Sequence, residues 1–267
     1  MKIAAQMYTL HELIGTPEEL ARALEKVRDI GYEYVQGSAG AFDTLDGPST
    51  RKLLDAADLK CAATHVSLEM MRDTAALKDY HEALECKYTA LGGFGWGGVD
   101  QDAWMGFAEE FSGLARNAAK AGVKIGYHNH AHEWSPFGLA DDPAGISPKR
   151  TPMELLLDKL DPTVWFEIDT YWVQAGGGDP TAWIARCEGR LPVLHCKDMT
   201  VSPQQEPKMC EVGAGNLHWR SILEAARKAG TEVLCVERDR GDLDPYESLR
   251  VSRENLEQML EEAAAVA

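Results

Sequence analysis

The sequence predicts an α/β protein that forms a single (β/α)8 TIM barrel domain over residues 1–267. The length is close to that of one barrel domain. Eight strand-like apolar runs alternate with helix-like segments along the chain. Three successive runs also end in a side chain that can bind a metal ion. In a barrel of this kind the carboxyl ends of all strands meet at one mouth, where active sites are built.

The strands are expected in the short apolar runs, and the helices in the longer amphipathic segments between them. The expected strands span 3–7, 32–35, 59–64, 88–91, 123–127, 164–168, 192–194 and 233–236. After a first helix that opens at Thr16, the expected helices span 49–58, 74–85, 101–121, 151–160, 179–187, 217–229 and 245–264. Two longer irregular stretches, 131–150 and 199–216, would be loops at the mouth of the barrel.

Helix boundaries in the sequence agree with this alternation. Thr16 is an N-cap residue, Pro17 follows at the first helical position, and Glu19 stands where a capping box requires it. A glycine at position 31, 122 or 230 follows a helix-like segment directly, as expected of a tight turn into the next strand.

Composition restricts the classes of partner. There are 27 Lys and Arg residues against 43 Asp and Glu residues, a formal net charge of −16. This balance argues against nucleic acid and anionic membrane surfaces as partners, while a local basic pocket could still hold an anionic substrate. There is no long apolar run at the N-terminus or elsewhere, and the six cysteines are scattered without a CxxC pair. We therefore expect a soluble, cytoplasmic protein with free thiols.

Asp169, His195 and Glu237 each follow or end an apolar run, and they are expected to converge at the barrel mouth. Asp, His and Glu are ligands of divalent cations. Each residue also has a structural alternative: Asp169 as a helix cap, His195 as a buried hydrogen-bonded histidine, and Glu237 as a salt-bridged residue at the rim. The glycines at 176–178 are expected to delay the next helix until Asp179.

The densest polar cluster, His128-Asn129-His130-Ala131-His132-Glu133, follows the fifth strand. Its histidines could be metal ligands, substrate hydrogen-bond partners or proton carriers. Glu133 is the preferred fourth metal ligand, with His128 and His130 as competing alternatives.

Three further features lie at strand ends. His65 ends the third strand and is a candidate substrate-binding residue. Lys197 could bind a substrate oxygen or pair with Asp198. The Gly213-Ala214-Gly215 segment could be a simple turn or a phosphate-binding loop before a helix.

These residues resemble the xylose isomerase-like TIM barrels, a group of sugar phosphate isomerases and epimerases that includes inosose dehydratase-like and ketose 3-epimerase-like enzymes. The resemblance extends over nearly the whole chain. It depends on segments 127–134, 167–173, 195–199, 211–215 and 236–237. It implies one divalent metal ion (Mn, Mg, Co or Zn), held by Glu133, Asp169, His195 and Glu237. The chain departs from many relatives in carrying Gln36 where they have Glu, and in ending the fifth strand with His-Asn-His.

The resemblance implies a divalent-metal-dependent sugar or sugar phosphate isomerase or epimerase acting through an enediolate on a small-molecule sugar. Glu133 and Glu237 would transfer protons, and His65, His130 and Lys197 would bind the substrate. A keto-sugar or keto-inositol dehydratase would use the same intermediate. A metal-dependent endonuclease needs a basic face, against which the charge weighs, and a non-catalytic sugar-binding barrel would show no metal dependence. The sequence leaves a homo-oligomer open.

Overall fold

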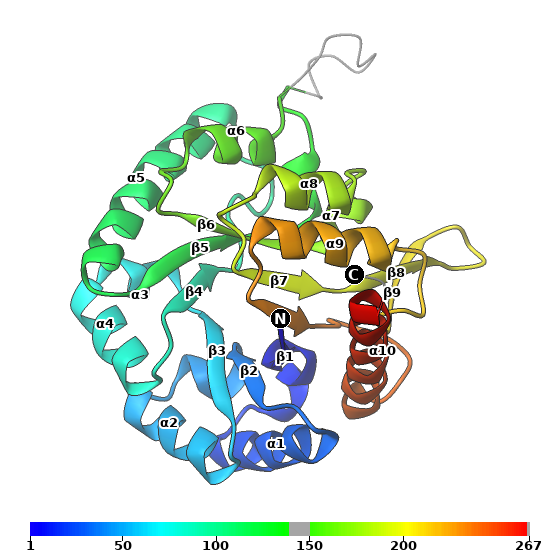
Figure 1. Cartoon of the computed structure of the whole chain (residues 1–267). Helices are drawn as coiled ribbons and strands as arrows, with labels where there is room; N and C mark the ends of the chain where they lie inside the picture. The colour runs from blue at the N-terminus through cyan, green and yellow to red at the C-terminus, as the bar shows by residue number, and fades with distance from the viewer. Residues whose placement is uncertain (139–149, 266–267) are drawn as a thin grey trace.

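The computed structural model describes residues 1–138 and 150–265, and its centre is a closed barrel of eight parallel strands (Figure 1). The strands follow one another around the barrel in the order β1-β10-β7-β6-β5-β4-β3-β2. They span β1 Lys2–Gln6, β2 Tyr34–Gly37, β3 Lys60–His65, β4 Tyr88–Leu91, β5 Lys124–His128, β6 Trp165–Asp169, β7 Val193–Cys196 and β10 Val233–Val236. The predicted (β/α)8 barrel is confirmed, including its closure.

The helices surround the barrel (Figure 1). They span α1 Pro17–Ile30, α2 Gly47–Ala56, α3 Leu68–Arg72, α4 Thr74–Ala83, α5 Gln101–Lys120, α6 Pro152–Lys159, α7 Thr170–Ala175, α8 Pro180–Arg186, α9 Trp219–Ala229 and α10 Pro245–Ala265, with 3-10 turns η1 Met7–Leu13, η2 Gly40–Asp43 and η3 Ala131–Trp134. The predicted capping box opens α1, because Thr16 Oγ1 accepts from the Glu19 N–H and Glu19 Oε2 accepts from the Thr16 N–H. None of the helices in the described ranges combines the length and apolar character needed to cross a bilayer.

Three successive layers of side chains fill the barrel and place the site. The lower layer is largely apolar and includes Ala4, Trp165, Val193 and Val233. Side chains two positions further along a strand point to the same face, so the next layer toward the mouth contains Gln6, Glu167, His195 and Cys235. One more step adds Asp169, Lys197 and Glu237. The strand period therefore directs a stack of polar side chains into the mouth.

Two elements differ from the expectations. Helix α7 begins immediately after Asp169, so the prediction that the glycines at 176–178 delay the helix until Asp179 was wrong. The predicted loop 199–216 contains an antiparallel hairpin, β8 Asp198–Val201 with β9 Pro207–Cys210, which projects from the barrel (Figure 1). Both elements follow strands β6 and β7, so both contribute to the mouth. The predicted loop 131–150 lies partly outside the described residues.

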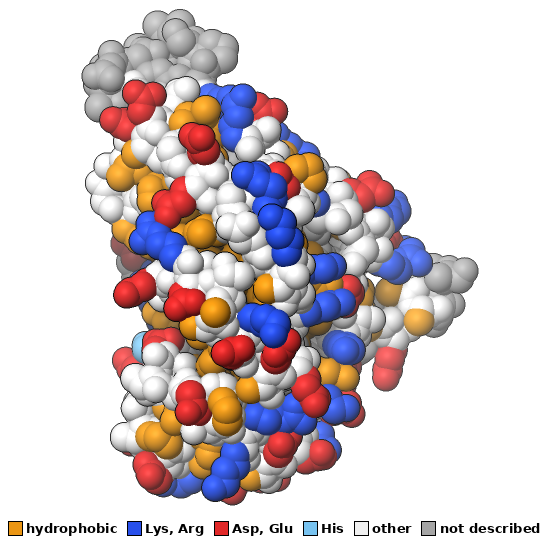
Figure 2. All heavy atoms as spheres, turned by 90° about the vertical axis from the view of Figure 1, so that its left-hand side faces the viewer, with side chains coloured by type: hydrophobic (Ala, Val, Ile, Leu, Met, Phe, Trp, Pro, Cys, Tyr) orange, Lys and Arg blue, Asp and Glu red, His pale blue; other side chains and the backbone are white. Residues whose placement is uncertain are grey.

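The outer face formed around α4 and α5 carries both signs of charge, interspersed over the surface (Figure 2). Arg72 of α3 pairs with Glu110 of α5 at 2.7 Å, and Lys78 and Glu82 pair along α4 at 3.0 Å. The cations on this face are thus partly neutralised by neighbouring acids.

Candidate metal and active site

The structure brings Asp169, His195 and Glu237 together as the sequence predicts. Potential ligand atoms of these three residues, here called the Asp–His–Glu group, all lie within 4.8 Å of one another. His195 Nδ1 is 2.8 Å from Glu237 Oε2 and 3.9 Å from Asp169 Oδ2. Asp169 ends β6, His195 lies in β7 directly beside it, and Glu237 follows β10. The neighbouring strands therefore position all three buried side chains at one point.

Lys197 supplies a buried cation to this group. Its Nζ atom lies 3.0 Å from Asp169 Oδ2, 3.0 Å from Glu237 Oε2 and 2.7 Å from Asp239 Oδ1. Burial alone would lower the pKa of Lys197, but these three carboxylates raise it well above its usual range. The ammonium is thus charged, and it pairs with these acids rather than with Asp198, the alternative partner considered from the sequence.

The ionisation of the Asp–His–Glu group follows from its surroundings. Burial favours a higher pKa for Glu237, but the charges of Lys197 and His195 hold that pKa well below its usual range. Burial raises the pKa of Asp169 to about 6, against the opposing charge of Lys197. Glu237 is therefore an anion at neutral pH and can accept a proton or bind a cation.

Asp169 has two functions in the structure. Its Oδ1 atom accepts a hydrogen bond from the Trp172 N–H and caps α7, so the structural alternative considered for this residue is also realised. Its own N–H donates to Asn129 Oδ1 at 3.0 Å. Its Oδ2 atom is buried and has no hydrogen-bond partner among the described residues, and it faces the Lys197 ammonium. One carboxylate oxygen thus fixes the backbone while the other is directed into the site.

A second set of potential ligands lies beside the first and shares His195. This imidazole–Glu167 group consists of His65, His128, Glu167 and His195. Glu167 Oε2 contacts His65 Nε2 and lies 3.2 Å from His195 Nε2 and 3.4 Å from His128 Nδ1. Gln36 Nε2 donates to Glu167 Oε1 at 2.8 Å, so the amide fixes the other carboxylate oxygen.

Glu133 lies outside both groups. Its Oε1 atom accepts from the Tyr127 hydroxyl at 2.7 Å, and its Oε2 atom accepts from the His130 N–H at 2.8 Å. Burial raises the pKa of Glu133 to about 8, although these hydrogen bonds favour the anion. The predicted role of Glu133 as metal ligand and proton-transfer group stays a prediction, because the structure places its carboxyl group in a separate buried network.

His130 and two tryptophans form an aromatic wall beside the site. The His130 ring centre lies 4.5 Å from that of Trp96 and 5.2 Å from that of Trp172. Burial lowers the pKa of His130 far below its usual range, so the ring is neutral. Trp96 is 61% exposed and therefore offers a flat apolar surface to a ligand. Lys197 Nζ lies 5.5 Å from the centre of the Trp172 ring.

The Gly213-Ala214-Gly215 segment has its backbone donors occupied. Asp198 Oδ2 accepts from the N–H groups of Gly213 and Gly215 and from Trp219 Nε1. A Cβ atom at Gly215 would lie only 2.4 Å from Asp198 Oδ1, which explains the glycine there. The carboxylate of Asp198 binds the N–H groups that a phosphate would need. Of the two alternatives considered from the sequence, the structure therefore favours the simple turn over the phosphate-binding loop.

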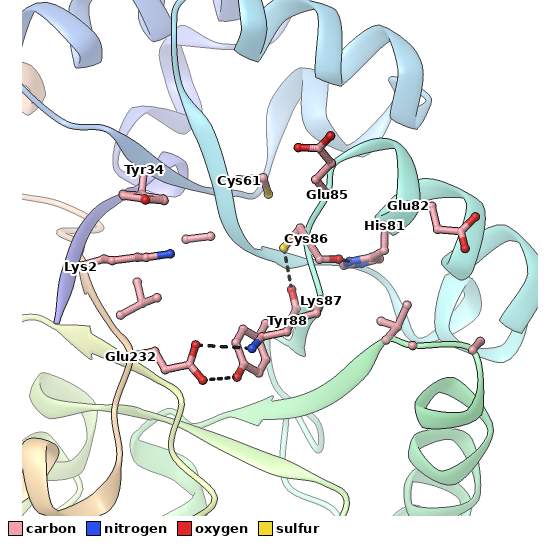
Figure 3. Close-up of a pocket in the computed structure, with 15 residues that line it drawn as sticks. Lys2, Tyr34, Cys61, His81, Glu82, Glu85, Cys86, Lys87, Tyr88 and Glu232 are labelled. Atoms are coloured by element: carbon pink, nitrogen blue, oxygen red, sulfur yellow. Dashed lines mark hydrogen bonds and ion pairs between the residues drawn. The ribbon is translucent and has the colours of Figure 1, made fainter.

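A separate pocket of about 480 Å³ lies at the opposite end of the barrel (Figure 3). Its polar groups pair with one another: the Tyr88 hydroxyl donates to Glu232 at 2.6 Å, and Lys87 lies 3.5 Å from the same carboxylate. No residue of the two ligand groups lines it. Function in barrels of this kind is concentrated at the mouth, whereas the opposite end contributes stability.

The sequence prediction did not include Glu167 or Asp239 among the site residues. The strand period was the available signal for Glu167, because it precedes Asp169 by two positions and shares its face. Asp239 lies in the loop three residues after the end of β10, too far from the strand for the strand period to determine its side-chain direction.

The residues present fit a divalent cation. The Asp–His–Glu group offers two carboxylates and one imidazole, a donor set that suits Mg²⁺, Mn²⁺ or Zn²⁺. The buried Asp169 Oδ2 atom lacks a hydrogen-bond partner in the described part of the chain and is directed into the group. The charged Lys197 ammonium beside it shows that this position already accommodates positive charge.

Three solved structures with similar folds illustrate the relationship. A sugar phosphate isomerase/epimerase from Parabacteroides distasonis ATCC 8503 is 23% identical, with 96% of this chain and 93% of that chain covered and a TM-score of 0.74. A xylose isomerase-like TIM barrel protein from Mycobacterium smegmatis in complex with magnesium is 16% identical, with 98% and 97% covered and a TM-score of 0.73. The IolI protein with a bound zinc atom is 15% identical, with 98% and 99% covered and a TM-score of 0.72.

No curated protein matches the sequence significantly. The family model described as xylose isomerase-like TIM barrel matches residues 24–264, nearly the whole chain. The barrel mouth, with its Asp, His and Glu side chains at successive strand ends, lies within the matched range. The chain therefore belongs to the xylose isomerase-like TIM barrel family.

Proposed function

We propose that the protein is a divalent-metal-dependent sugar isomerase or epimerase that moves a proton at the carbon beside a sugar carbonyl. The observation that carries this proposal is the Asp–His–Glu group, in which an ionised, buried Glu237 lies beside a charged Lys197. Asp169, His195 and Glu237 would hold the ion, which when bound would polarise the substrate oxygens as a Lewis acid. Membership in the family and the fold shared with a sugar phosphate isomerase/epimerase support the proposal.

Glu237 is the proposed proton-transfer group. Its low pKa keeps it ionised at neutral pH, and it is only 6% exposed, so bulk water does not screen its charge. His195 Nδ1, at 2.8 Å, fixes the orientation of the carboxylate. A carboxylate held in this way can remove a proton from carbon and return one without leaving its position.

Lys197, His65 and His130 are the proposed substrate-binding residues. Lys197 Nζ can donate to a substrate oxygen that enters among Asp169, Glu237 and Asp239, and its backbone is fixed because Thr170 Oγ1 accepts from the Lys197 N–H and donates to the Lys197 carbonyl. His65 is partly exposed at the edge of the site. The neutral ring of His130 has a buried Nδ1 atom without a hydrogen-bond partner among the described residues, and this atom can bind a hydroxyl.

Glu133 was expected to share proton transfer with Glu237. Its hydrogen bonds to Tyr127 and the His130 backbone, and the raised pKa of its carboxyl group, support a positioning role for the segment that carries His130. We therefore assign proton transfer to Glu237 alone among these two carboxylates.

Solvent exchange tests the proposal directly. Keto-sugars, with and without a phosphate group, are incubated in D2O with protein that has been stripped of metal and reloaded with Mn²⁺, and deuterium at carbon is followed by NMR. The proposal predicts metal-dependent incorporation into at least one sugar and conversion to its isomer or epimer. Loss of water from that sugar would instead identify the dehydratase. Metal-independent binding without exchange would show a sugar-binding barrel.

A further inference from the structure

The imidazole–Glu167 group contains one buried ring nitrogen that lacks a hydrogen-bond partner among the described residues. The Nδ1 atom of His128 lies 3.4 Å from Glu167 Oε2 but forms no hydrogen bond with it, and it has no other hydrogen-bond partner in the described ranges. His128 is only 3% exposed. A buried ring nitrogen without a hydrogen-bond partner in the described ranges and a carboxylate oxygen thus face one another.

A metal ion between His128 Nδ1 and Glu167 Oε2 would give the ring nitrogen the partner that it lacks. The same carboxylate oxygen also faces His65 Nε2 and His195 Nε2, so three ring nitrogens surround it. These residues come from β3, β5, β6 and β7 and end or nearly end their strands. We propose that the imidazole–Glu167 group is a second metal site, separate from the Asp–His–Glu group and selective for zinc-class ions.

The donor chemistry sets the selectivity. Three imidazole nitrogens and one carboxylate oxygen form a four-ligand set that suits Zn²⁺ or Co²⁺, whereas Mg²⁺ requires mainly oxygen ligands. Gln36 fixes the other oxygen of Glu167 and leaves Oε2 for the ion. An amide that orients a ligand carboxylate is a common feature of metal sites.

The buried charge also accommodates a second ion. Four carboxylates meet at the mouth, those of Glu167, Asp169, Glu237 and Asp239, and in the described part of the chain the ammonium that pairs with them is that of Lys197. A divalent ion bound here would offset part of this excess negative charge.

His195 connects the two sites. Its Nδ1 atom faces Glu237, while its Nε2 atom faces Glu167 at 3.2 Å and the carbonyl oxygen of the Gln36 side chain at 2.8 Å. With both sites filled, His195 would contribute to both groups, and its ring would release its N–H protons to solvent to do so. Removal of His195 is therefore expected to affect both ions, whereas His65 and Asp169 each belong to one group.

Metal content measured by mass spectrometry tests the second site without any sugar. Protein stripped with a chelator, reloaded with Zn²⁺ and freed of excess metal is expected to hold two ions per chain, and protein loaded with Mg²⁺ at most one. His65→Ala and Asp169→Asn should each hold one zinc ion, and His218→Ala, which changes an exposed histidine, should hold two. With Co²⁺, His65→Ala should lose the visible absorption of a nitrogen-rich tetrahedral site.

One zinc ion per wild-type chain, or two in His65→Ala, would overturn the inference. If His65→Ala fails to fold by circular dichroism, His128→Gln provides the same test, because it removes a different ligand of the same group. The two proposals can fail separately, because metal content is measured without sugar, whereas the proposed proton transfer depends on the Asp–His–Glu group and is measured by deuterium exchange.

Discussion

Replacing Glu133 with Gln should destabilise the protein at acid pH and stabilise it at alkaline pH. The carboxyl group of Glu133 is fully buried, and burial raises its pKa from 4.5 to about 8. A carboxyl group with a raised pKa contributes stability that is fully present below pH 4.5 and is lost as the pH rises through 8. At 1.36 kcal/mol per pKa unit, a shift of about 3.5 units corresponds to a loss of about 5 kcal/mol.

Gln cannot ionise, so it removes this pH dependence. It also replaces one accepting oxygen by an NH2 group, which cannot accept a hydrogen bond from the Tyr127 hydroxyl or the His130 N–H, at a cost of about 1 kcal/mol at every pH. The metal-free variant should therefore be about 1 kcal/mol less stable than wild type at pH 4 and about 4 kcal/mol more stable at pH 9.

Urea unfolding of the metal-free proteins at pH 4, 7 and 9, followed by circular dichroism, measures this difference. Glu12→Gln, a change at an exposed carboxylate, is the matched control and should show no comparable reversal. Stability curves for Glu133→Gln and wild type that stay parallel from pH 4 to 9 would refute the reasoning. A loss of bound metal in Glu133→Gln would return this residue to the ligand role expected from the sequence.

Three further predictions concern charge at the mouth and on the surface. Asp169→Ala and His195→Ala should each lose divalent metal without unfolding the barrel; full metal content in both variants, measured by mass spectrometry, would place the ion elsewhere. Lys197→Met should destabilise the metal-free protein by about 3–5 kcal/mol in urea unfolding, because it leaves two buried carboxylates and the partly exposed Asp239 without their cation, and added Mn²⁺ should restore part of the loss. Binding to abasic DNA at physiological salt should be undetectable by fluorescence anisotropy at micromolar protein, given a net charge of −16; submicromolar binding would favour an endonuclease.

The barrel could be predicted from the sequence because each of its determinants is local. Apolar runs of strand length, the capping box at Thr16 and the glycine at 31 each specify one boundary, and the structure contains all of them. The hairpin of β8 and β9 was missed because its strands are short and partly exposed, so they carry little apolar pattern. Helix α7 was missed because the glycines after it were expected to keep the chain extended.

The site was only partly predictable. Asp169, His195 and Glu237 were identified because a strand end fixes both the position and the direction of a side chain. Glu133 lies in the 3-10 turn η3, and the direction of a side chain in such a turn depends on tertiary contacts, here with Tyr127. The partners of Lys197 could not be identified because they lie far from it in the sequence: Asp169 ends β6, and Glu237 and Asp239 follow β10.

Deuterium incorporation by Glu237→Gln tests the central claim most directly. The substitution retains the shape of the side chain and one oxygen that can bind metal, but removes the base. In the Mn²⁺-loaded protein, exchange at the sugar carbon should fall by roughly 100-fold or more, the usual size of a general-base contribution. Glu133→Gln, measured in parallel, should keep exchange within a few-fold of wild type. Unchanged exchange in metal-loaded Glu237→Gln would contradict the account and leave Glu237 as a salt-bridge residue at the barrel rim.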